Sequence, residues 1–209
     1  PKRRTRATIA KEKGLEPLAN IILLQMTDKS LEEEAKAFLS EEKEVKTVSD
    51  AIAGAKDIVA ESISDEADYR IRIRDMTVKK GRVVSAAKNP KEQSVYEMYY
   101  EYEEPVAKVA GHRVLALNRG EKEKILTVKI EAPTEDIIRY LEKQVITRGN
   151  PNTTPVLKAV VEDSYSRLIG PAIEREIRND MTEKAEDGAI KVFKKNLEQL
   201  LMQPPIVGQ

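Results

Sequence analysis

The chain has 209 residues, of which 34% are charged and 40% hydrophobic, and its 36 Lys and Arg residues balance its 36 Asp and Glu residues. This composition is typical of a globular protein of one large or two small domains, and the zero net charge means that binding to nucleic acid would need a local excess of cations. The absence of Cys excludes disulfides, a thiolate nucleophile and Cys-based metal sites, and the lack of a signal peptide or a long apolar run predicts a cytoplasmic location.

The N-terminal 13 residues are basic, with Glu12 as their one anion. The six cations are Lys2, Arg3, Arg4, Arg6, Lys11 and Lys13. Fixed cations release the counterions that are condensed on a nucleic acid, so this segment is a candidate arm for contacting phosphates. A solvated arm without a partner explains the same residues equally well.

Two short helices are expected next. Pro17 stands at a plausible first helical position, and Leu18, Ile21, Ile22 and Gln25 would then share one helical face. Ser30 and Glu33 match a capping box, in which the serine hydroxyl bonds the Glu33 amide. We expect an acidic helix to follow, ending near residue 39.

A helical pair is predicted over 50–63 and 65–80, with Ser49 and Asp50 as the first N-cap. Residues 70–74 alternate with period two, which permits a strand, but acids before the segment and bases after it favour a helix. The pair could form a DNA-reading helix-turn-helix whose cations are Arg70, Arg74, Lys79, Lys80 and Arg82. Because Arg72 points away from the face that Arg70 and Arg74 share, an ordinary helical hairpin is the better interpretation.

An acidic helix is expected over 92–103. Its tyrosines could stack on bases, but the neighbouring glutamates would repel phosphates, so we interpret these tyrosines as core or interface residues. They are Tyr96, Tyr99, Tyr100 and Tyr102. Residues 112–132 are the least helical part of the chain: Arg119 and Gly120 interrupt the pattern, and 125–130 reads as a strand.

Three helices are predicted in the last third of the chain. The first is capped at 134–136 and ends near 149–151, and the second begins at Thr154 and is broken at Gly170 and Pro171. The third is capped by Thr182 and ends before Pro204. The second would bury Leu157, Val160, Val161, Tyr165 and Leu168, and the third carries an apolar stripe of Ala185, Ala189, Val192, Phe193, Leu197 and Leu200.

The expected fold is therefore mainly α, a multi-helix bundle that includes the helix-turn-helix-like hairpin, with one or two short β-strands near 113–131. We expect a basic arm and helices over 1–48, a region with the hairpin, the tyrosine helix and the strand over 49–132, and long helices over 133–203. Residues 204–209 would begin a linker or strand into a further domain, so the chain is expected to be a fragment.

The pattern does not indicate an enzyme. His112 is the one histidine, and no G-x-S-x-G, P-loop or G-x-G-x-x-G motif is present. The carboxylates occur in solvated helical runs and not as isolated acids in apolar surroundings, which are the acids suited to proton transfer. We expect no catalytic residues, no cofactor and no metal.

Several strings resemble the Tex transcription accessory proteins, in order and over essentially the whole chain. The first pair, KRRTRATIA at 2–10 and KGLEPLA at 13–19, is followed by YYEY at 99–102 and LALNRGEKE at 115–123. Further strings are REIR at 175–178, TEKA at 182–185 and LLMQPP at 200–205.

The resemblance implies a bacterial, cytoplasmic, multidomain protein related to a eukaryotic transcription-elongation factor. In that family a helical N-terminal region precedes an RNase H-like domain, helix-hairpin-helix motifs and an OB-type RNA-binding domain. This chain would be most of the N-terminal region. It would act as a non-enzymatic scaffold with an auxiliary phosphate-contacting arm and bind RNA or DNA weakly by itself. The alternative is a protein-interaction module that docks on the transcription or translation machinery.

Overall fold

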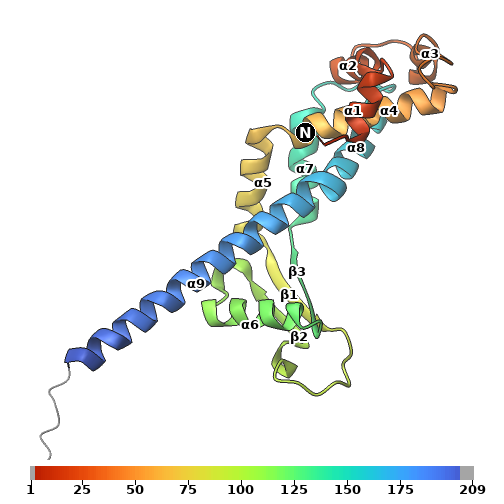
Figure 1. Cartoon of the computed structure of the whole chain (residues 1–209). Helices are drawn as coiled ribbons and strands as arrows, with labels where there is room; N and C mark the ends of the chain where they lie inside the picture. The colour runs from red at the N-terminus through yellow and green to blue at the C-terminus, as the bar shows by residue number, and fades with distance from the viewer. Residues whose placement is uncertain (1–2, 203–209) are drawn as a thin grey trace, which may run out of the picture. The chain divides into compact units, whose positions relative to one another are not determined.

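A computed structural model describes residues 3–202 of the chain, shown in Figure 1. The fold is mainly α-helical with one small antiparallel sheet, as the sequence predicts. The chain forms two compact units. One comprises the described residues up to Asp75 together with Pro133–Ile173, and the other comprises Met76–Ala132 together with the described residues from Glu174 onward. The domain boundaries expected from the sequence stay predictions.

The first unit is built around helix α4 (Val48–Ser64), whose buried face consists largely of small and β-branched side chains. Helices α1 (Arg6–Glu12), α2 (Glu16–Leu24), α3 (Leu31–Lys36) and α8 (Thr154–Asp163) pack on α4, and α7 (Thr134–Val145) packs on α8. The small side chains allow close approach: a Cβ on Gly54 would lie 2.4 Å from Leu15 Cδ1. This explains how short helices bury an aliphatic core.

Most of the predicted helices in this unit are confirmed. The Ser30 hydroxyl accepts a hydrogen bond from the Glu33 amide at 3.2 Å, so the capping prediction at α3 is correct, although α3 ends at Lys36. The N-cap of α4 predicted at Ser49 and Asp50 is wrong, because Thr47 caps the helix by accepting from the Asp50 amide at 3.0 Å. Helix α5 (Ala67–Lys80) confirms the helical interpretation of 65–80.

The predicted break at Gly170 and Pro171 is wrong. Helix α8 continues through a π-helical turn, η3 (Ser164–Ile169), into α9 (Gly170–Met202), and the Gly170 amide donates to the Tyr165 carbonyl five residues earlier. A π-turn changes the hydrogen-bond spacing, so a proline, which has no N–H, can enter without ending the helix. Thr182 is also not a cap: it lies inside α9, where its hydroxyl donates to the Arg178 carbonyl at 2.9 Å.

The second unit contains the sheet, with strand order β2-β1-β3. Strand β1 (Arg82–Ala87) pairs antiparallel with β2 (Glu101–Pro105) on one side and with β3 (Leu126–Glu131) on the other. Alternate residues of β3 are buried, and helix α6 (Gly111–Lys122) packs on this strand (Figure 1). The expected strand near 125–130 is thus confirmed as β3, and two further strands precede it.

Two secondary-structure predictions in this unit are wrong. The expected acidic helix over 92–103 is a loop, the 3₁₀ turn η1 (Glu97–Tyr99) and strand β2. The stretch 112–132, expected to be the least helical, begins inside helix α6, which also contains Gly120. A second 3₁₀ turn, η2 (Val106–Lys108), precedes this helix. Gly120 is tolerated because Leu126 fills the space that a side chain there would need.

Candidate nucleic-acid interface

The predicted basic arm runs into helix α1 in the first unit. Thr5 caps this helix, since its hydroxyl accepts from the Thr8 amide at 3.1 Å. Ala7 and Ala10 are buried where α1 packs on α4, so the charged residues of α1 lie on its outer face and flanks. Lys2 lies outside the described residues.

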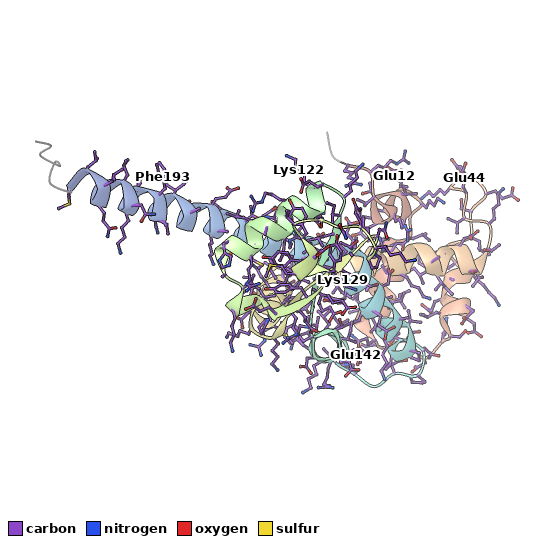
Figure 2. The ribbon with its side chains drawn as sticks, turned by 90° about the horizontal axis from the view of Figure 1, so that it is seen from below. Glu12, Glu44, Lys122, Lys129, Glu142 and Phe193 are labelled. Carbon is purple, nitrogen blue, oxygen red and sulfur yellow. The ribbon has the colours of Figure 1, made fainter. Side chains whose placement is uncertain are left out.

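The cations of the arm differ in how far acids neutralise them. Arg4 forms an ion pair with Glu12 at 2.6 Å, and both side chains are exposed (Glu12 is labelled in Figure 2). Arg3 and Lys11 are exposed and have no ion pair with any residue in 3–202. Because solvent-exposed ion pairs contribute little, a phosphate could displace Glu12 from Arg4 at small cost.

Arg6 and Lys13 line a hollow of about 350 Å³ between α1 and α4. Three carboxylates, those of Glu44, Asp50 and Asp57, line the same hollow. Burial raises the pKa of the Asp57 carboxyl, and the guanidinium groups of Arg167 and Arg6 oppose that rise. These two cations therefore face acidic groups and offer less positive potential to a phosphate than Arg3 and Lys11 do.

The cations predicted on the helical hairpin are divided between the two units. Arg70 donates from Nε to the Ser64 carbonyl at 2.6 Å, so it caps the C-terminal end of α4. Arg74, which lies on α5 as Arg70 does, is half-buried. Lys79 and Lys80 end α5 in the second unit, where Arg82 of β1 pairs with Glu103. The use of Arg70 as a cap removes one cation from a DNA-reading face, and the helix-turn-helix role stays a prediction.

The tyrosines of the acidic segment over 92–104 form hydrogen bonds and ring contacts within the second unit. The Tyr96 hydroxyl donates to the Glu123 carboxylate and the Tyr102 hydroxyl to the Glu104 carboxylate. Tyr99 meets Tyr102 edge to face with ring centroids 5.2 Å apart. Tyr96 and Tyr99 are buried, which confirms their interpretation as core residues. The hydrogen bond to Glu123 raises the pKa of Tyr96, and burial raises that of Tyr102.

Sequence reasoning missed a second ordered polar surface in the first unit, the loop 146–153. Buried Gln25 holds it: its side-chain amide donates to the Val145 carbonyl at 2.9 Å, and its carbonyl accepts from the Thr147 amide at 3.0 Å. Arg148 is exposed on this loop. The one sequence signal that could have indicated this contact is a glutamine, Gln25, on the apolar face of a predicted helix, because a polar side chain there needs a hydrogen-bond partner.

Within residues 3–202, no group of three or more His, Asp or Glu side chains is arranged to hold a metal ion. His112 is exposed at the start of α6. None of the helices over the same residues is long and apolar enough to cross a membrane.

Comparison with known proteins places these surfaces in context. The family described as Tex central region-like matches residues 27–193. The chain is 55% identical to YdcI of Bacillus subtilis over its whole length, and 30% identical to the transcriptional accessory protein Tex of Neisseria gonorrhoeae over 98% of its length. It is 28% identical to the human S1 RNA-binding domain-containing protein 1, also over 98% of its length. The chain spans 29%, 28% and 22% of these three relatives.

Proposed function

This chain belongs to the Tex central region-like family, and we propose that it is a non-enzymatic helical scaffold in a cytoplasmic, nucleic-acid-associated transcription accessory protein. The names of two relatives, a transcriptional accessory protein and an S1 RNA-binding domain-containing protein, support the association with transcription and nucleic acid. Because the chain spans less than a third of each relative, the activity and partners of the whole protein are part of this proposal.

The observation that carries the scaffold role is the distal half of α9. Ile190, Phe193, Leu197 and Leu200 follow the 3-4-3 spacing of a helix that packs along its length on a partner. Yet the side chain of Phe193 is 68% exposed and that of Leu200 is 64% exposed, and Figure 2 shows Phe193 on a stretch of α9 with no other described helix or strand of the second unit beside it. An apolar stripe of this size favours an interface with another folded element.

The basic arm would add phosphate contacts to this scaffold. Arg3, Arg6 and Lys11 are exposed and form no ion pair with the described residues, although Arg6 lies beside acidic groups, and Arg4 is held only by a surface ion pair. Two or three such contacts would give weak, salt-dependent binding without base recognition.

Fluorescence anisotropy of labelled single-stranded RNA and duplex DNA, titrated with the chain at roughly 50 and 200 mM salt, tests the arm. Replacing Lys2, Arg3, Arg4 and Arg6 with Ala should weaken binding and reduce the salt slope by about 0.7–0.9 for each lost phosphate contact. A charge-matched control replaces four exposed lysines elsewhere: Lys122, Lys124, Lys194 and Lys195. Equal slopes for the wild type and the arm variant would reject the arm.

A second candidate function is docking on a basic protein of the transcription or translation machinery. The observation that favours it is the acidic segment over 92–104, where two apolar side chains, Val95 at 85% and Met98 at 60%, are exposed beside the glutamates. Salt-sensitive association with purified RNA polymerase, without binding to nucleic acid, would support docking over the phosphate-contacting arm.

A further inference from the structure

The two edge strands of the small sheet, β3 and β2, differ in whether other residues form hydrogen bonds to their outward backbone groups. On β3, two of the backbone groups that point away from β1 are hydrogen-bonded to side chains of α9. The Ile130 amide donates to Glu174 Oε1 at 2.6 Å, and the Val128 carbonyl accepts from Arg178 Nη1 at 3.3 Å. Glu174 and Arg178 are four residues apart and so share one face of the helix. Side chains of α9 therefore cover part of this edge of the sheet.

The β2 edge is open. The hydrogen bonds from the Ala87 amide to the Tyr100 carbonyl (3.2 Å) and from the Val106 amide to the Gly81 carbonyl (3.0 Å) fix which residues of β2 face β1. Because hydrogen-bonded pairs alternate along an antiparallel ladder, Glu101 and Glu103 direct their amide and carbonyl groups outward. No hydrogen bond to these groups comes from any residue in 3–202.

The surroundings of this edge are acidic and partly apolar. Residues 92–107 contain five glutamates and no cation. Two cations reach the strand from elsewhere in the same unit: Arg82 pairs with Glu103, and the Arg113 guanidinium lies 5.8 Å from the centre of the Tyr102 ring. Glu101 remains exposed, and Val95 and Met98 precede the strand on the outer loop.

We propose that the β2 edge binds an extended, basic segment of a protein partner by β-strand addition. Main-chain hydrogen bonds to Glu101 and Glu103 would supply the affinity, and lysine or arginine at alternate positions would pair with their carboxylates. The proposal rests on the second candidate function, docking on a basic protein, and names the surface and the form of the partner.

A second copy of this chain fits the edge poorly. Antiparallel pairing of two β2 edges would set glutamates of one strand against glutamates of the other, and like charges placed opposite each other destabilise a sheet. The same glutamates, together with the short length of β2 and its terminal Pro105, discourage indiscriminate pairing. A basic strand is the partner for which the charges become favourable.

A labelled nine-residue peptide in which lysine alternates with valine tests the proposal. It should bind the chain saturably, and the amide protons of Glu101 and Glu103, which have no hydrogen-bond acceptor among the described residues, should become protected from exchange on binding. Two control peptides have the same sequence and charge. One is N-methylated at every lysine and the other at every valine, so each lacks about half of the backbone N–H donors. The peptide whose methylated nitrogens face β2 should bind about tenfold more weakly, because it cannot donate main-chain hydrogen bonds to this strand.

Protein variants separate charge from backbone pairing. Replacing Glu101→Gln and Glu103→Gln should weaken binding of the basic peptide about tenfold, whereas the matched change Glu183→Gln with Glu186→Gln, on exposed positions of α9, should leave it unchanged. Equal binding of both N-methylated peptides, or no protection of the Glu101 and Glu103 amides, would overturn strand addition.

Association with RNA polymerase that persists in the Glu101→Gln, Glu103→Gln variant would overturn the proposed site and leave docking intact. If RNA polymerase does not associate with the chain but the peptide binds and protects the Glu101 and Glu103 amides, polymerase is rejected as the docking partner. The proposal of strand addition at β2 is then still supported.

Discussion

At the scale of single residues, Gln25 shows how much one buried polar side chain can organise. Its backbone is left-handed (φ 55°) and its side chain is buried, and this amide satisfies the Val145 carbonyl and the Thr147 and Arg148 amides of the loop after α7. A buried backbone group without a partner is costly, so the glutamine fixes where α7 ends.

Replacing Gln25 with Ala should therefore lower the free energy of unfolding by about 2–4 kcal/mol, since it leaves the buried Val145 carbonyl and two part-buried amides without their partner. Urea denaturation followed by circular dichroism measures the loss. Asn20→Ala, on the exposed face of the same helix, is the control and should change stability by less than about 0.5 kcal/mol. Equal effects of the two substitutions would contradict the role of the Gln25 hydrogen bonds.

Tyr102 should make the stability of the protein depend on pH in the alkaline range. Burial, followed by the hydrogen bond to the Glu104 carboxylate, raises the pKa of this phenol. Folding thus favours the protonated form. The stability that this preference contributes is complete below about pH 10, the ordinary tyrosine pKa, and is lost as the pH rises through the raised value.

The urea midpoint should consequently fall as the pH rises above about 10, and it should fall less in the Tyr102→Phe variant, which keeps the ring and lacks the ionisable hydroxyl. Comparing the two proteins cancels the effect of lysine deprotonation. A decline that is the same in both would show that Tyr102 does not cause it.

At the scale of elements, two glycines in helices of the second unit have opposite roles. A Cβ on Gly120 of α6 would lie 2.5 Å from Cδ1 of the buried Leu126, whereas a Cβ on Gly188 of α9 would meet nothing within 4 Å. Gly120 permits α6 to pack on β3, while Gly188 serves no packing purpose among the described residues.

Gly120→Ala should destabilise the protein by about 1–3 kcal/mol through overpacking. Gly188→Ala should stabilise α9 by about 0.5–1 kcal/mol, because alanine is the better helix former. Helical content and the thermal midpoint of each variant check the pair. A gain in stability for Gly120→Ala would mean that Leu126 can move aside.

At the scale of the whole molecule, the apolar stripe on the distal half of α9 is separate from the core. Replacing Phe193 and Leu200 with Ser should change the free energy of unfolding of this chain by less than about 0.5 kcal/mol, since both side chains are exposed. Ile177→Ala, at a buried position of the same helix, should cost about 2–5 kcal/mol.

The same double substitution should reduce binding of a hydrophobic dye and any self-association in sedimentation velocity. A large loss of stability on replacing Phe193 and Leu200 would show that the stripe is buried within this chain, and would remove the observation behind the scaffold role.

The sequence by itself determined most of the helices, because their signals are local. The capping pair Ser30 and Glu33, the apolar spacing in α8 and the alternation in β3 each need only neighbouring residues to act. The basic character of the arm also follows from composition alone, whereas its contact with phosphates stays a prediction.

Tertiary structure decided the rest. The segment over 92–104 has the composition of a helix, but pairing with β1 makes part of it a strand, and the alternation of Glu101, Tyr102 and Glu103 is too short to predict this. The partial cover of the β3 edge depends on side chains of α9 that lie more than 40 residues away in sequence, whereas the β2 edge receives no such contact from the described residues. Such contacts are invisible locally, because the free energy of a strand or of a buried glutamine comes from its distant partner.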